Sequence, residues 1–160
     1  MQGQPGSLDT VTILDETDRR ILGFLDTDPR ATGLWIAQSL GLARGTVQAR
    51  LEKLQADGVL SPHSTRVKPT SLGYPLRALV TAEVDQSEFD GMIADMTDID
   101  EVTEVVGIAG ASDLMIEIVA RDADHVYDIT QRIMRCRGIN HTATSIVLRR
   151  LIERRHTQLF

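Results

Sequence analysis

The most regular pattern of apolar and polar positions lies in residues 32–60, and it predicts two short helices joined by a tight turn. In the second helix, Val47, Leu51 and Leu54 recur at the spacing that places them on one face. The opposite face is polar or small and consists of Arg44, Gly45, Gln48, Ala49, Glu52 and Lys53. A helix-turn-helix needs this division, because one face packs on its own domain and the other enters the DNA major groove. Similar helix pairs occur in ordinary helical domains, so the pattern alone leaves both interpretations open.

The neighbouring segments extend this prediction to a winged helix-turn-helix domain. Asp15 is expected to cap an earlier helix, with Asp18 three residues on as its capping-box partner. Residues 59–68 are expected to form a short β-wing after the second helix of the motif. Arg66 and Lys68 would then reach the DNA backbone.

A stretch with two prolines and a glycine, residues 69–76, is interpreted as a linker between two domains. Residues 1–68 would form the DNA-binding domain, with residues 1–13 as a frayed lead-in. Residues 77–160 would form a second domain.

In the second domain the pattern predicts strand, helix, strand, strand, helix and strand. These elements are expected at residues 77–84, 87–96, 101–109, 113–120, 124–134 and 139–152. The order is that of an α+β ferredoxin-like fold, with four antiparallel strands and two helices on one face. The other face would be bare, and a bare apolar face usually serves dimerisation or ligand burial. We therefore expect at least a dimer.

The net charge of −6 conceals an uneven distribution along the chain. Residues 1–76 have eight acidic and eight basic side chains, whereas residues 77–160 have fifteen and nine. Residues 44–68 contain five bases and two acids. Phosphate binding needs a local positive patch and not a basic protein, so the acidic average does not exclude DNA. A solvated charged face is the alternative interpretation of this patch.

The remaining composition excludes several classes of site. Cys136 is the only cysteine, which excludes an internal disulfide and a zinc site built on several cysteines. The four histidines lack metal-ligand spacing, so no metal and no cofactor is expected. The polar start of the chain does not resemble a signal peptide, and no apolar run has membrane-spanning length. The sequence thus predicts a soluble cytoplasmic protein.

Several stretches are similar to one known family. LDETDRRILGFLDTDPRAT, IAQSLGLARGTVQARLEKLQADGVL and LGY lie in the first half of the chain. VVGIAGASDLMIEIVARD contains a Gly-x-x-Asp loop, and RGINHTATSIVLRRL follows near the end. Together they resemble the Lrp/AsnC (leucine-responsive, feast/famine) family of transcriptional regulators over residues 14–152. The joint signal is specific, although each piece alone is weak.

The resemblance implies a protein that binds double-stranded DNA and an amino acid or related small-molecule effector. It also implies a second domain of the RAM or ACT type, a homodimer and further assembly, such as an octamer. The DNA-binding residues implied by position are Arg44, Gly45, Thr46, Gln48, Ala49, Arg50, Lys53, Arg66 and Lys68. The effector-binding residues implied are Gly110, Ser112, Asp113, Thr142, Thr144 and Ser145. The aspartate would pair with the ligand's α-amino group, and the hydroxyls would meet its polar end.

Structural alternatives exist for some of these residues. Arg50 is also able to form a salt bridge within its own domain, and Asp113 is able to cap a hairpin. Thr142 and Thr144 have the β-branched shape that strands favour. The sequence also departs from the family at four positions, where a serine cap, a glutamate, a longer polar residue and an aromatic residue are usual. These positions are Ala43, Trp35, Ala49 and Ser112.

Three functions compete for this sequence. The leading hypothesis is a sequence-specific, effector-responsive transcription factor that binds pseudo-palindromic DNA. The first alternative is an architectural DNA-binding protein without a metabolic ligand. The second is an enzyme, since some siroheme decarboxylases resemble this family and depend on histidine and arginine. His125 and His141 are available for such a role, but the recognition helix favours DNA.

Overall fold

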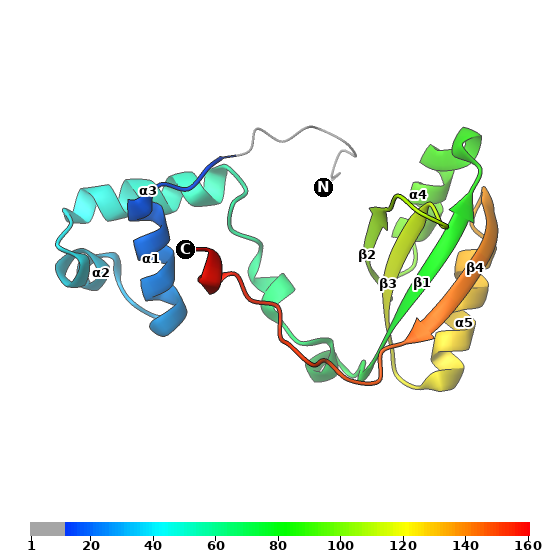
Figure 1. Ribbon diagram of the computed structural model, residues 1–160. Coiled ribbons are helices and arrows are strands. Elements are labelled where there is room, and N and C mark those ends of the chain that lie inside the picture. Colours follow the sequence, from blue (N-terminus) through cyan, green and yellow to red (C-terminus); the bar gives the residue numbers. More distant parts are fainter. Residues whose placement is uncertain (1–11) are drawn as a thin grey trace. The chain divides into compact units, whose positions relative to one another are not determined.

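The computed structural model describes residues 12–160, so the expected lead-in lies almost entirely outside the described residues. The chain divides into two compact units (Figure 1). One contains the N-terminal part up to His63 together with Glu153–Phe160, and the other contains Ser64–Ile152. The proline- and glycine-containing stretch at residues 69–76 therefore belongs to the second unit.

The first unit contains three helices, α1 (Glu16–Thr27), α2 (Gly33–Leu40) and α3 (Arg44–Ala56). The predicted capping box at the start of α1 is confirmed. The Asp18 N–H donates to Asp15 Oδ1 at 2.9 Å, and the Asp15 N–H donates to Asp18 Oδ2 at 3.2 Å. Two donors that have no partner within the helix are thereby satisfied.

The three helices pack around a small apolar core. Its buried members, Ile21, Ile36, Ala37 and Val47, come from all three helices. Between α2 and α3 the chain turns at Gly41, whose φ of 68° is a conformation that side chains with a Cβ rarely adopt. The helix-turn-helix predicted from residues 32–60 is therefore present.

The expected β-wing is absent. Residues 59–68 contain no strand, and a short 3₁₀ helix, η1 (His63–Arg66), lies there instead. A second 3₁₀ helix, η2 (Pro69–Leu72), follows it. The segment lacks alternating apolar residues, and Pro62 has no N–H for a strand ladder. The domain is thus a helix-turn-helix without a β-wing at residues 59–68.

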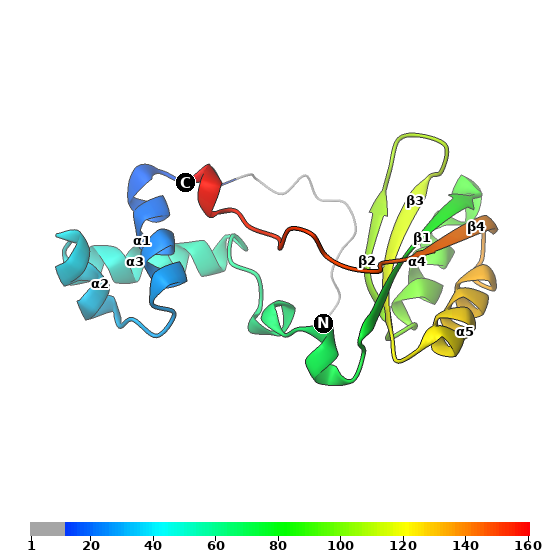
Figure 2. The ribbon, with the colours of Figure 1, turned by 60° about the horizontal axis from the view of Figure 1, so that its bottom comes forward.

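The second unit is a four-stranded antiparallel sheet with strand order β2-β3-β1-β4. The strands are β1 (Leu76–Val84), β2 (Val102–Gly107), β3 (Leu114–Ala120) and β4 (Ile139–Ile146). A short 3₁₀ helix, η3 (Gln86–Glu88), precedes α4 (Phe89–Thr97), and α5 (Ala123–Met134) follows β3. Figures 1 and 2 show α4 and α5 on the same face of the sheet. The predicted ferredoxin-like plan is confirmed.

The core of this unit lies between the sheet and its two helices. The strands contribute alternate residues, such as Val80 and Ile116, and the helices contribute Met92 and Ile129, all four fully buried. This alternation follows from the two-residue period of side chains along a strand. The opposite face of the sheet has no covering element in the described part of this unit.

The last strand is shorter than predicted, since β4 ends at Ile146 and not at residue 152. Its final bond to β1 is donated by the Val147 N–H to the Arg77 carbonyl at 2.9 Å. β1 begins at Leu76, directly after Pro75, so β4 has no further strand to pair with beyond that point. A further 3₁₀ helix, η4 (Thr157–Leu159), lies near the C-terminus.

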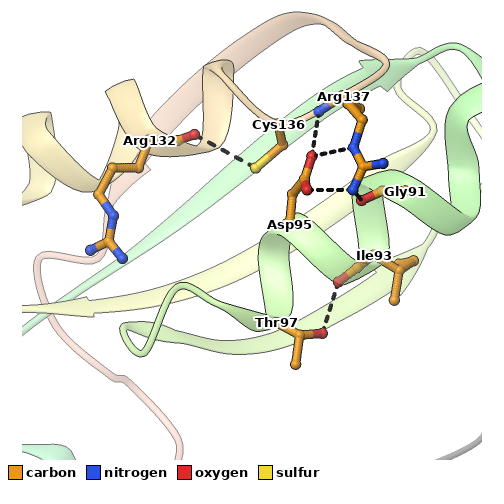
Figure 3. Close-up of polar contacts among 7 residues, drawn as sticks. All are labelled: Gly91, Ile93, Asp95, Thr97, Arg132, Cys136 and Arg137. Atoms are coloured by element: carbon orange, nitrogen blue, oxygen red, sulfur yellow. Dashed lines mark hydrogen bonds and ion pairs between the residues drawn. The ribbon is translucent and has the colours of Figure 1, made fainter.

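A side-chain clamp joins α4 to the start of β4 (Figure 3). Two nitrogens of the Arg137 guanidinium donate to Asp95, Nη2 to Oδ1 at 2.7 Å and Nε to Oδ2 at 2.9 Å. Nη2 also donates to the Gly91 carbonyl at 3.1 Å. A Cβ at Gly91 would lie 2.9 Å from Arg137 Cζ, so a larger residue there would require the guanidinium to shift. The hydrogen bonds from Arg137 hold the pKa of Asp95 down, at about 2.

Candidate nucleic-acid interface and effector site

The polar face of α3 is open to solvent. Val47 and Leu54 point into the first unit and are at most 2% exposed. The residues predicted to face DNA on the other side are all exposed, namely Arg44, Gly45, Thr46, Gln48, Ala49 and Lys53. Gln48 donates from Nε2 to Glu52 Oε1 at 2.7 Å, so its amide must leave this bond before both of its groups are free to meet a base.

The start of α3 is suited to an anion. Ala43 precedes the helix and provides no side-chain hydrogen bond, as the sequence predicted. The first N–H groups of the helix therefore lack a side-chain cap, and the helix dipole places partial positive charge there. A DNA phosphate is a chemically suitable partner for such an end.

Arg50 lies on a different side of α3, against α1. Its Nη1 atom forms an ion pair with Asp15 and a second with Asp18 Oδ1 at 3.0 Å. The hydrogen bond from Arg50 lowers the pKa of Asp15. These contacts are those of the structural alternative, in which Arg50 fixes α3 on its own domain.

Arg66 and Lys68 are exposed but belong to the second unit of the chain, whereas α3 belongs to the first. Their expected placement depended on the wing that did not form.

Asp113 stands at a junction of three strands. Its N–H donates to the Ala82 carbonyl of β1 at 3.0 Å, and its carbonyl accepts from Ile108, just after β2, at 2.8 Å. Its side-chain Oδ2 accepts from the Val84 N–H at 2.9 Å. Within the described chain Oδ1 makes no hydrogen bond. The carboxylate therefore has a structural role and one oxygen left for a ligand.

A shallow cavity of about 510 Å³ opens beside this carboxylate. Most of its wall is apolar, and Asp113 is the only charged residue among the described residues that line it. The other lining residues are Val84, Gln86, Phe89, Gly107, Ile108 and Leu114. An apolar wall with one carboxylate suits a small molecule that has an ammonium group and an apolar body.

The other predicted effector residues do not line this cavity. Gly110 and Ser112 lie in the loop before Asp113. Thr142 and Thr144 pair with Ala82 and Val80, which face the helices, and the Oγ1 atoms of Thr144 and Thr130 are 3.3 Å apart.

Ser145 lies on the other face of the sheet, because it pairs with Leu79. The three hydroxyl residues of β4 are therefore not gathered at one place on this chain. Sequence reasoning also missed the apolar walls of the cavity. Phe89 and Ile108 have the pattern of ordinary core positions, and only the sheet register places them near Asp113.

The histidine considered for an enzyme role is held by other groups. His125 is 8% exposed, and its Nδ1 accepts from the Arg121 N–H at 3.2 Å. Its Nε2 lies 3.2 Å from Glu101 Oε1. Both ring nitrogens are thus engaged. Among the described residues no cluster of His, Cys, Asp or Glu is arranged to hold a metal ion. No helix in residues 12–160 is long and apolar enough to cross a membrane.

An exposed recognition helix joined to a ferredoxin-like domain with a small cavity defines a class of protein, the helix-turn-helix regulators with a ligand domain. Models of known protein families match both halves of the chain. The AsnC-type helix-turn-helix domain matches residues 14–55, and the Lrp/AsnC ligand binding domain matches residues 77–157. The chain belongs to the Lrp/AsnC family of transcriptional regulators.

Individual proteins similar to this chain also belong to this class of regulators. The HTH-type transcriptional regulator LrpA of Mycobacterium tuberculosis is 30% identical over 144 residues, which cover 89% of this chain and 96% of that protein. The regulator FL11 of Pyrococcus abyssi is 29% identical over 136 residues, covering 85% and 90%. The solved structure of E. coli AsnC has a TM-score of 0.80 at 26% identity and covers 91% of this chain and 99% of that one. These relatives are named transcriptional regulators and not enzymes.

Proposed function

We propose that this chain regulates transcription by binding operator DNA through α3, and that an amino acid or a related metabolite controls this binding. The exposed polar face of α3 is the observation that supports it most strongly. Family membership supplies the class of activity. The effector, the operator specificity and the assembly are the proposed parts.

On the DNA side, the residues of the first two turns of α3 meet base edges. Arg44 is suited to the two acceptors of guanine, and Gln48 to the donor and acceptor of adenine. Thr46, Gly45 and Ala49 allow close approach, while Lys53 contacts a phosphate. Arg66 and Lys68 add phosphate contacts from the neighbouring unit. Arg50 holds α3 in place.

On the ligand side, Asp113 Oδ1 accepts from the ammonium group of an amino acid. The side chain of the ligand lies against the apolar wall formed by Phe89, Ile108 and Leu114. Gly110 and Ser112, in the adjoining loop, offer backbone groups to the ligand's carboxylate. The hydroxyls of Thr142, Thr144 and Ser145 enter the site only through a second copy of the chain.

The open face of the sheet is the proposed dimer interface. Leu79, Thr81 and Met115 are half-buried there, opposite the face that α4 and α5 cover. A second copy would cover this apolar surface, and further assembly, as in an octamer, would join such dimers. A ligand that favours one assembly shifts the population toward it and so changes which operator spacing is bound.

A thermal-shift screen of the amino acids tests the ligand part. A ligand at about 100 times its Kd stabilises the folded protein by about 2.7 kcal/mol, so a specific binder produces a clear shift. Asp113→Asn is the informative variant, because its amide oxygen is still able to accept from Val84 while the charge is gone. A ligand whose shift disappears in Asp113→Asn supports the site.

The architectural alternative remains the second candidate. It predicts no shift with any metabolite and shallow sequence preference. A flat screen of a protein that still binds DNA would favour it over an effector-controlled regulator.

A further inference from the structure

The last fourteen residues differ in charge from the domain they follow. Residues 77–146 contain fourteen acidic and five basic side chains. Residues 147–160, which we call the C-terminal arm, contain four arginines and one glutamate. The arm is thus a positively charged segment attached to an acidic domain. Its arginines are Arg149, Arg150, Arg154 and Arg155.

The end of the arm packs on the helix-turn-helix unit. Glu153–Phe160 forms one compact unit with the N-terminal helices, and Figures 1 and 2 show η4 beside α1. The Phe160 ring lies 3.9 Å from the position a Cβ would take on Gly23 of α1. Phe160 and Thr157 line a cavity of about 560 Å³ together with Glu16, Arg19, Arg20 and Gly23.

One residue that lines this cavity also bonds to the end of α2. Arg20, one of its lining residues, donates from Nη2 to the Leu40 carbonyl at 2.9 Å. Leu40 is the last residue of α2, three positions before the cap of α3. Arg20 therefore contacts both the end of α2 and the cavity that the arm lines.

The arginines close to this end of the arm are open to solvent. Arg154 and Arg155 are exposed, and within residues 12–160 neither forms an ion pair that neutralises it. Exposed arginines on a basic segment beside a DNA-binding motif are suited to phosphate oxygens, which they bind without regard to base sequence.

We propose that the C-terminal arm is a second DNA-binding element, in which Arg154 and Arg155 contact backbone phosphates beside the site occupied by α3. This inference rests on the proposed function of α3. The arm adds affinity and salt dependence, whereas the exposed face of α3 provides the choice of sequence.

The test compares the full chain with Arg154→Gln/Arg155→Gln on a mixed-sequence duplex of about 40 base pairs, at salt concentrations from about 50 to 200 mM. Arg121→Gln/Arg135→Gln is the matched control, since it removes the same charge from exposed positions of the second unit. Each phosphate contact contributes about 0.9 to the slope of log K against log salt. The slope of the arm variant should be shallower by about 1.8 per bound protomer. Over this range of salt, the affinity of the wild type should therefore fall about tenfold more than that of the variant.

Three results would overturn the proposal. One is a salt slope of the arm variant equal to that of the control, while the wild type binds normally. Another is a salt slope equal to that of the control together with a changed oligomeric state, measured by light scattering. The arginines would then contact the acidic surface of another copy of the chain and not DNA. A wild-type protein that binds no DNA at any salt would overturn the function of α3 as well, so the two failures are distinguishable.

Discussion

Arg50 of α3 and Asp18 of α1 are 32 residues apart in sequence, and their Nη1 and Oδ1 atoms are 3.0 Å apart. Asp18 is 8% exposed and also takes part in the capping box that starts α1. The same side chain thus begins one helix and positions another. The shared carboxylate therefore links the start of α1 to α3.

Replacing Arg50 by glutamine should lower the thermal midpoint by a few degrees, because Asp18 then loses its cation while remaining largely buried. Arg30→Gln is the control, since Arg30 is an exposed arginine of the same unit that has no proposed contact with DNA. Differential scanning calorimetry of both variants measures the difference. Equal midpoints, with DNA binding lost only in Arg50→Gln, would instead make Arg50 a phosphate contact.

Replacing Arg44 by alanine should weaken binding to a selected operator by ~1–3 kcal/mol if Arg44 contacts a base. Discrimination at the base pair it contacts should relax at the same time. Fluorescence anisotropy with the operator and with single-base variants measures both quantities. A uniform loss on every sequence would show a phosphate contact and would remove Arg44 from the base-contacting set.

Two helical glycines should respond differently to alanine. Gly45 has open space around its missing Cβ, so Gly45→Ala should stabilise the fold by up to about 0.5–1 kcal/mol. At Gly91 the new methyl would displace the Arg137 guanidinium from Asp95, and Gly91→Ala should therefore be less stable than Gly45→Ala. Urea unfolding of both variants tests this, and an equal gain would show that the clamp has no net effect on stability.

The Arg137–Asp95 clamp also predicts a pH dependence. The pKa of Asp95 is about 2 in the folded protein, below its ordinary 3.8. The clamp therefore stabilises the fold above pH 3.8, and this contribution is lost as the pH falls toward 2.

An NMR titration of the Asp95 carboxyl measures this directly. In Arg137→Gln the pKa should rise, although the backbone N–H of residue 137 still donates to Oδ2 and keeps it below the ordinary value. In the control Arg135→Gln it should not move. A pKa that stays at about 2 in Arg137→Gln would assign the shift to another group.

Local signals in the sequence are sufficient for much of the fold. The capping box at Asp15, the tight turn between α2 and α3 and the missing side-chain cap at Ala43 are short-range features, and all three appear as predicted. The prediction of a β-wing is wrong because a wing depends on pairing between strands, and residues 59–68 have no such pairing. The predicted length of β4 is wrong for a similar reason, since it is set by where β1 begins.

The site is harder to predict than the fold. Asp113 is recognisable from its loop, but its bonds to Val84 and Ala82 depend on the register of three strands. Arg50 contacts residues that lie 32 and 35 positions away in the sequence. The sequence therefore suggests a salt bridge within the domain only as an alternative to a DNA contact. The family resemblance implies that Thr142 and Ser145 bind the effector together. The two-residue period of β4, however, places them on opposite faces of the sheet.

We propose that α3 recognises a specific DNA sequence as part of a symmetric assembly. Repeated selection of bound duplexes from a random-sequence library, followed by sequencing, tests this claim and identifies the operator in the same experiment. We expect an enriched sequence with two-fold related half-sites about 10 base pairs apart or a multiple of that spacing, and loss of this enrichment in Arg44→Ala. A library that remains random after selection, despite tight binding, would contradict it and favour an architectural role.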